Sequence, residues 1–178
     1  ALEMAIYTGS RQQAGKSTAT PPTVSRAKPL QEADKEKIKA ILGKIDPFTR
    51  VNTKLLHAIA AQCMLQEYRA LEVISMEGES AEIDGFVVLS GRVAMLKTSL
   101  NGRELVVQLV GPKSSFGLLA SLDSATQELT ARAQIESQLL HVPKKSLLFL
   151  LSEQPELYPE FLAELSRRMG ALHNMARS

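Results

Sequence analysis

The feature that most constrains this chain is a change in the spacing of its apolar residues near residue 71. Before that point they recur three or four residues apart, as at Ile38, Ile41 and Ile45, which is the spacing of an amphipathic helix. After it, short apolar runs alternate with Gly, Ser, Asp and Asn, which is typical of strands joined by tight turns. These runs occupy residues 71–76, 85–90, 92–98 and 103–110.

Helices are predicted before the strands, over residues 31–45 and 52–64, and Asn52 or Thr53 suits the N-cap of the second helix. One further strand is predicted over residues 129–142, with one face formed by Leu129, Ala131, Ala133 and Ile135. Helical spacing then returns up to residue 177. This order predicts an α+β fold, an antiparallel jelly-roll barrel of the double-stranded β-helix type flanked by N-terminal helices and a long C-terminal helix.

The length of 178 residues suits one domain with an appendage, or at most two small domains. Residues 8–29 are rich in Ser, Thr, Gly, Pro and Gln and have no apolar period, so we expect residues 1–29 to be flexible or disordered. The folded domain is expected over residues 30–178. Its predicted parts are helices within 31–65, a barrel over 71–142 and helices over 144–176.

The net charge of +2 is distributed unevenly along the chain. Residues 1–30 hold four basic residues and Glu3, a balance of +3, which leaves 17 basic and 18 acidic residues, or −1, for the remainder. A body with this balance is a poor binder of a phosphate backbone. Cys63 is the only cysteine, and no apolar run of eighteen residues or signal-peptide pattern is visible, so we expect a cytoplasmic protein without membrane contact.

The strand region resembles the cyclic-nucleotide-binding domain of the Crp–Fnr, or catabolite activator, superfamily of bacterial transcription regulators. Four features in order carry the resemblance: Glu77-Gly78-Glu79, Leu89-Ser90-Gly91-Arg92-Val93, the turn Gly102-Arg103-Glu104, and Phe116-Gly117 at the start of an expected short helix. Gly78 and Gly102 also fit tight turns that require positive φ, and Gly91 fits a bend at a barrel corner. The resemblance covers roughly residues 35–178 and implies a non-catalytic role in signal transduction.

In that family, the glycine-opened helix presents backbone N–H groups to the cyclic phosphate. The following glutamate holds the ribose, and an arginine about ten residues later pairs with the phosphate. Here the glutamate position is Leu118, and the arginine position falls on Gln127 or Glu128. The preceding loop has Lys113 where a second glycine is usual. Leucine accepts no hydrogen bond, and a neutral or acidic side chain does not hold a phosphate.

We therefore expect no cyclic AMP binding of the usual kind and no cofactor, although a different small ligand stays open. The strand alternation places Arg132 opposite Leu129 and Ala131, and a substitute role for it stays open as well. The candidate pocket residues are Gly91, Arg103, Phe116, Gly117, Leu118, Leu119, Gln127, Glu128 and Arg132.

The last predicted helix carries an apolar seam with alternating steps of four and three. Its members are Tyr158, Leu162, Leu165, Met169, Leu172 and Ala176. In the resembled family this helix is the dimer interface and a helix-turn-helix domain follows it, so the resemblance implies a homodimer. We expect contact with DNA only through a domain absent from this chain, because the sequence ends at Ser178.

Other chemistry has no support in the sequence. Residues 9–18 nearly match a phosphate-binding P-loop, but the glycine spacing is wrong and two prolines follow. His57, His141 and His173 lie in different predicted elements and form no metal motif with Cys63, so no metal or catalytic group is expected. Haem ligation by a histidine or Cys63 stays open, although core packing is the more common role of such a cysteine. The leading hypothesis is a dimeric regulatory sensor domain with an altered pocket. The alternatives are a structural protein–protein interaction module, or a receptor for another nucleotide or small ligand that uses Arg103, Lys113 or Arg132.

Overall fold

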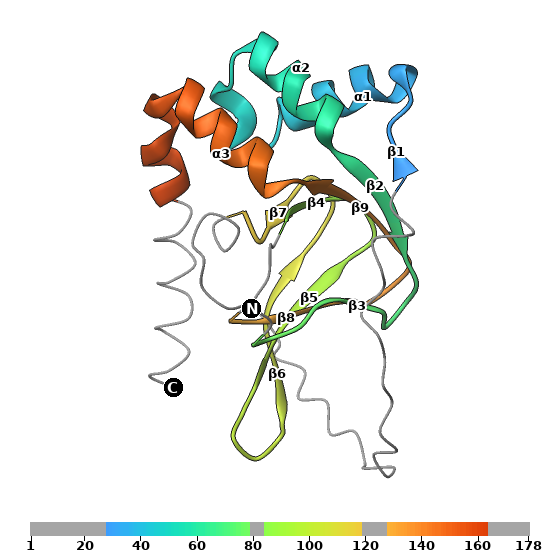
Figure 1. The fold of residues 1–178 in the computed structure, drawn as a ribbon. Coiled ribbons are helices and arrows are strands. Elements are labelled where there is room, and N and C mark those ends of the chain that lie inside the picture. The colour runs from blue at the N-terminus through green and yellow to red at the C-terminus, as the bar shows by residue number, and fades with distance from the viewer. Residues whose placement is uncertain (1–27, 79–83, 119–127, 164–178) are drawn as a thin grey trace.

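The computed structural model describes residues 28–78, 84–118 and 128–163, in which helices gather on one side of two antiparallel sheets (Figure 1). The larger sheet has the strand order β1-β2-β9-β4-β7, and the smaller has the order β3-β8-β5-β6. The hairpin of β5 and β6 extends away from the helices. This arrangement confirms the α+β class expected from the sequence.

The helical elements are α1 (Glu32–Leu42), the 3-10 turn η2 (Phe48–Arg50), α2 (Thr53–Gln62), α3 (Lys144–Glu153) and the 3-10 turn η3 (Pro155–Leu157). Helical conformation resumes over residues 158–163. The strands are β1 (Lys28–Pro29), β2 (Met64–Tyr68), β3 (Val73–Ser75), β4 (Gly85–Ser90), β5 (Val93–Thr98), β6 (Glu104–Val110), β7 (Ser115–Phe116), β8 (Thr130–Ala133) and β9 (Ser137–Val142).

The four apolar runs that predicted strands are confirmed as β3, β4, β5 and β6. The two predicted N-terminal helices correspond to α1 and α2, and the side chain of Asn52 caps α2 by accepting a hydrogen bond from the N–H of Leu55. Gly78 and Gly102 both adopt the expected positive φ. The remainder of the predicted C-terminal helix beyond residue 163 lies outside the described residues, as do residues 1–27.

The single strand predicted over residues 129–142 was wrong. The chain forms β8 and β9, which belong to different sheets, because it turns at residues 134–136. There the N–H of Gln134 donates to the carbonyl of Arg92, and Ser137 Oγ donates to the carbonyl of Ile135. Ala131 and Ala133 face a core as expected, but Ile135 is about half exposed.

Two short strands lie outside the predicted barrel limits. Met64–Tyr68, predicted in part as the end of a helix, forms β2 and pairs with β9. Lys28–Pro29, placed in the segment expected to be flexible, forms β1 and pairs with β2. Cys63, the C-cap residue of α2, has an extended backbone conformation. The helix therefore ends there, although the apolar residues continue with Met64 and Leu65.

The larger sheet separates two apolar cores. The helix-side core lies between this sheet and the helices, and its buried residues include Leu42, Phe48, Ile59, Val87, Leu118, Leu140, Val142, Leu147 and Leu150. The barrel core lies between the two sheets and consists of Tyr68, Phe86, Val88, Val93, Met95, Val110, Phe116, Ala131, Ala133 and Leu139. Successive residues of β4 and β9 therefore contribute to opposite cores, as strand alternation requires.

The end of α3 is joined to the start of α2 by the buried amide of Gln154. Its Oε1 accepts the N–H of Asn52 at 3.1 Å, and its Nε2 donates to the carbonyl of Arg50 at 2.8 Å. Arg50 also pairs with Glu160 at 2.8 Å, in the helical turn that follows η3. These contacts fix the start of the C-terminal helical segment on the N-terminal helices.

Gly91 is required by space as well as by its φ of 92°. A Cβ atom at Gly91 would lie 2.6 Å from the carbonyl oxygen of Glu136, whereas a Cβ at Gly102, with φ 78°, would meet nothing within 4 Å. We predict that Gly102→Ala lowers the free energy of unfolding by about 1 kcal/mol through backbone strain alone. Gly91→Ala should lower it by about 3 kcal/mol or more, because the β8–β9 turn must also move. Urea denaturation measures both, and equal losses would contradict this role of Gly91.

Candidate functional site

The segment that should hold a ligand begins at β7, next to the first residues of β4. Phe116 pairs with Phe86 and Ser115 with Val87, and Gly117 follows with φ 72°. We call residues Ser115–Leu118 the lip. The short helix that the sequence predicts after Gly117 lies, beyond Leu118, outside the described residues, and so do Leu119 and Gln127.

Leu118 belongs to the helix-side core. Its side chain is 2% exposed, and it lies against Gly85 at the start of β4 and near Leu147 of α3. The residue at the family's ribose-binding position thus has an apolar environment formed by a strand and a helix. An apolar side chain in such a site is stabilised by burial, and it has no polar atom to offer a sugar.

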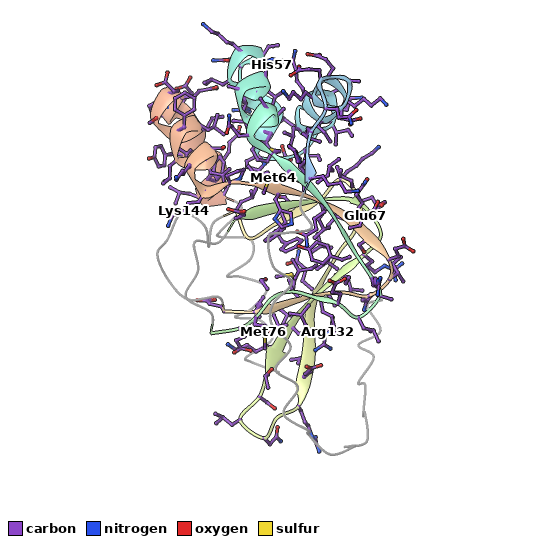
Figure 2. All side chains as sticks on the ribbon, turned by 45° about the vertical axis from the view of Figure 1, so that its right-hand side comes forward. His57, Met64, Glu67, Met76, Arg132 and Lys144 are labelled. Atoms are coloured by element: carbon purple, nitrogen blue, oxygen red, sulfur yellow. The ribbon has the colours of Figure 1, made fainter. Side chains whose placement is uncertain are left out.

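Arg132 is held by a carboxylate. Its Nη1 and Nη2 donate to the two oxygens of Glu104 at 2.9 and 2.8 Å, so the pair is bidentate. These bonds hold the pKa of Glu104 below its usual value and raise the pKa of Arg132. Figure 2 shows Arg132 on the smaller sheet, on the side of the molecule away from the helices. Its neighbours Ala131 and Ala133 face the barrel core, so Arg132 lies on the opposite face of β8.

The other described candidates do not gather at the lip. Gly91 follows the last residue of β4, at the end of that strand remote from Gly85. Arg103 lies in the β5–β6 turn, where its N–H donates to Ser99 Oγ. The Glu128 side chain is exposed, and its carbonyl accepts a hydrogen bond from Lys97 Nζ. Lys113, two residues before β7, is exposed and adopts the left-handed φ of 64° that a glycine takes at no cost.

Sequence reasoning missed a polar and aromatic cluster around Phe116 of the lip, whose other members are Tyr68, Asp84, Phe86 and His141. The rings of Phe86 and Phe116 stack with centroids 4.9 Å apart, and His141 meets Phe86 edge-on at 4.6 Å. Tyr68 Oη and His141 Nε2 are hydrogen-bonded at 2.9 Å. His141 Nδ1 lies 3.9 Å from Asp84 Oδ2. The only signal in the sequence was the position of His141 two residues after Leu139, on the inward face of a strand.

Burial dominates the ionisation of this cluster. It lowers the pKa of His141 to about 4, so the imidazole is neutral near pH 7 and its Nε2 can accept a hydrogen bond from the Tyr68 hydroxyl. It also raises the pKa of Tyr68 above its usual value, with smaller contributions from Glu72 and Asp84. Cys63 has its thiol pKa raised to about 12 by burial first and Asp84 second, so it is an inert thiol.

One buried side-chain nitrogen in this region has no hydrogen-bond partner among the described residues. Gln66, on β2 between Met64 and Tyr68, is 3% exposed, and its Nε2 makes no hydrogen bond within the part of the chain that the structure describes. The same described residues contain no group of three or more His, Cys, Asp or Glu side chains that could hold a metal ion. None of their helices has the length and hydropathy needed to cross a membrane.

Comparison with known proteins identifies this arrangement. Residues 65–154 match the family described as the cyclic nucleotide-binding domain. The chain belongs to this family. The matched range runs from β2 through α3 and includes the lip and the polar cluster. The chain therefore contains a domain of the cyclic-nucleotide-binding family, with the jelly-roll fold that the sequence predicted.

Related regulators support this assignment. The chain is 23% identical over 134 residues to the CRP-like cAMP-activated global transcriptional regulator of Mycobacterium tuberculosis, covering 75% of this chain and 59% of that protein. It is 31% identical over 84 residues to the cyclic AMP receptor protein of Thermus thermophilus, covering 47% and 39%. The match thus spans 59% of the length of the first relative and 39% of the length of the second.

A solved structure confirms the fold. The sensor domain of the transcriptional regulator DNR from Pseudomonas aeruginosa superimposes with a TM-score of 0.69 at 21% sequence identity, covering 79% of this chain and 94% of that one. The similarity reaches across nearly the whole of that sensor domain. The expected α+β jelly-roll fold is therefore confirmed.

The buried His141 makes stability depend on pH. Its folded pKa of about 4 lies below the usual 6.5, so the unfolded chain binds more protons between these values. We predict that the free energy of unfolding is highest, as far as His141 is concerned, above pH 6.5. It should fall by up to about 3 kcal/mol as the pH drops toward 4, because the unfolded chain then takes up the proton that folded His141 does not bind. Urea denaturation between pH 7.5 and 4.5 measures this loss. His141→Gln should flatten the profile, and a profile unchanged by that substitution would contradict the prediction.

Proposed function

We propose that this chain is a non-catalytic sensor module of the Crp–Fnr type whose output does not depend on cyclic AMP bound in the usual way. The observation that carries the proposal is the environment of Leu118. At the position where the resembled family has a ribose-binding glutamate, this chain has an apolar side chain buried among Gly85 and the residues of the helix-side core. Because Leu118 offers no acceptor, a nucleotide would lose a charge-assisted hydrogen bond.

The pairing of Arg132 supports the same proposal. The charge of Arg132 is already balanced by its bidentate pair with Glu104, and this carboxylate would repel a phosphate bound beside it. Gln127 and Glu128, at the family's arginine position, bring no positive charge. A module of this kind serves a transcription regulator or an assembly whose input is another ligand or a partner protein.

Binding of nucleotides tests this proposal directly. A ligand at one hundred times its Kd stabilises a protein by about 2.7 kcal/mol, which raises the Tm of a chain of this size by about 5–10 °C. We expect 1 mM cyclic AMP, cyclic GMP or cyclic di-GMP to shift the Tm by less than about 1 °C. A shift of several degrees would overturn the proposal. Nucleotide affinity would then be compared between wild type and Arg132→Gln. The variant should bind the nucleotide more weakly only if Arg132 contacts its phosphate.

We also propose that the module forms a homodimer through its C-terminal helical segment. Tyr158 and Leu162, the first two residues of the predicted seam, are 51% and 57% exposed, and they lie one helical turn apart. Phe161 between them is buried in the helix-side core, so the segment contacts its own fold on another face. The later seam residues, Leu165, Met169, Leu172 and Ala176, lie outside the described residues.

Analytical ultracentrifugation tests the dimer. We expect wild-type chain to sediment as a dimer at micromolar concentration and Leu162→Glu to weaken association at least about tenfold, because a charge would be buried at the seam. Ala163→Glu is the matched control, because it adds the same charge one residue along the helix, outside the seam. A monomeric wild type, or equal effects of the two substitutions, would contradict this interface.

A further inference from the structure

The larger sheet has one edge that the described strands cover only in part. On one side, β2 pairs with β9 along its full length, from Met64 to Tyr68. On the other side, β1 pairs only with Met64 and Leu65, so no described strand lies there beside Gln66, Glu67 and Tyr68. Figure 1 shows β1 next to the start of β2, at the margin of this sheet. An incompletely covered edge of this kind is a template for a further strand.

Pro29 determines which residues of the β1–β2 ladder exchange hydrogen bonds. Lys28 lies opposite Leu65, and Pro29 lies opposite Met64. In an antiparallel pair, hydrogen-bonded and non-hydrogen-bonded positions alternate, and a proline has no N–H to donate. Lys28 and Leu65 therefore occupy the hydrogen-bonded position. The N–H and C=O of Glu67, two residues after Leu65, point to the same side, where no described strand meets them.

The residues immediately before β1 match this edge in charge. Continuing the register of β1 toward the N-terminus gives three more pairs, which are Ala27 with Gln66, Arg26 with Glu67, and Ser25 with Tyr68. Arg26 would then lie opposite the exposed side chain of Glu67, and opposite charges at directly opposed positions stabilise a sheet. Because this is a hydrogen-bonded position, the main-chain groups of Arg26 would also bond those of Glu67.

The buried amide of Gln66 supplies a second and independent observation. Tyr68 and Leu139, which lie next to it on the same face of the sheet, belong to the barrel core, so the Gln66 side chain also points toward that core. This side chain is 3% exposed, and its Nε2 has no hydrogen-bond partner among the described residues. In the continued register Ser25 is the diagonal neighbour of Gln66 on this face, a separation that a long side chain can bridge. The Ser25 hydroxyl can therefore accept the unsatisfied N–H.

We propose that residues 24–27 extend β1 and close the edge of β2. In this arrangement Arg26 binds both the main chain and the carboxylate of Glu67, and Ser25 accepts a hydrogen bond from Gln66. The occupant of the edge is a segment of the chain itself, so a strand from another molecule cannot pair with β2 while residues 24–27 are in place. This arrangement is independent of whether the domain binds a nucleotide.

Arg26→Pro is the primary test, and Ala27→Pro is its matched control. Proline at position 26 removes the N–H of a hydrogen-bonded position, whereas position 27 alternates with 28 as Pro29 does, and the ladder already contains a proline at Pro29. Amide hydrogen exchange is followed by NMR in the full chain. We expect the Glu67 N–H to be protected in wild type and to exchange about tenfold faster in Arg26→Pro, but less than about twofold faster in Ala27→Pro.

The N–H of Tyr68 is the internal reference for this experiment. By the same alternation it points to β9, so it should stay protected in both proline variants. An unprotected Glu67 N–H in wild type, or equal effects of the two prolines on it, would overturn the proposal.

Charge reversal tests the Arg26–Glu67 pair without removing a main-chain donor. Arg26→Glu and Glu67→Arg each place like charges opposite each other, so each should speed exchange of the N–H at position 67. The double variant restores opposite charges and should restore most of the protection. A double variant that is no better protected than the two single variants would overturn the pairing of these residues.

Ser25→Ala tests the hydrogen bond to Gln66, and Thr23→Ala is its control, because the continued register places Thr23 past the end of β2. We expect the side-chain amide protons of Gln66 to exchange several-fold faster in Ser25→Ala and to be unchanged in Thr23→Ala. Equal exchange in the two variants would overturn the placement of Ser25 beside Gln66.

Discussion

The burial of the larger sheet on both faces is the constraint on which the rest of the structure depends. Phe86 and Val88 of β4 face the barrel core, and Val87 between them faces the helices. In β9, Leu139 and Leu140 divide in the same way. Because one pair of strands forms part of both cores, the helices and the smaller sheet cannot pack independently. Apolar residues at successive positions are therefore required in β4 and β9, and their runs read as continuous rather than alternating.

Polar groups occupy two different environments around this sheet. Between the sheets, the Tyr68–His141 hydrogen bond is enclosed by aromatic rings, and burial keeps the imidazole neutral. On the outer face of the smaller sheet, Arg132 and Glu104 remain partly exposed and charged, with side chains 28% and 47% exposed. The hydrogen bond of the inner pair offsets the cost of burying its two polar groups, while solvent screens the outer pair and limits its contribution to stability. Charge in this domain thus lies mainly outside the barrel core.

Local sequence patterns predicted much of this fold. The strands β4, β5 and β6 were visible because each is a short apolar run bounded by glycine or polar turn residues, and the Asn52 cap follows from hydrogen bonding within one turn. The separation of β8 from β9 was not visible, because the turn depends on the carbonyl of Arg92, more than forty residues away. The strand β2 was missed because Met64 and Leu65 continue the apolar pattern of the preceding helix.

The candidate site was harder to predict than the fold, because its geometry also depends on contacts between residues that are distant in the sequence. The identity of Leu118 was plain in the sequence, but the direction of its side chain depends on the missing Cβ of Gly85, 33 residues earlier in the chain. The bidentate partner of Arg132 lies on β6, which reaches β8 only across β5. His141 was named without a role, because its partners Tyr68 and Asp84 come from two other segments. Side-chain direction at a site depends on strand neighbours that spacing along one segment does not reveal.

The amide of Gln154 has a mechanical consequence for whatever meets the end of this domain. Its two hydrogen bonds use main-chain groups of Arg50 and Asn52, which belong to the opposite end of the sequence. In the next helical turn Glu160 pairs with Arg50, so the described helical residues 158–163 are held beside the start of α2. A force applied to residues 158–163 is therefore transmitted through Glu160 and Gln154 to Arg50 and Asn52, and so to the start of α2.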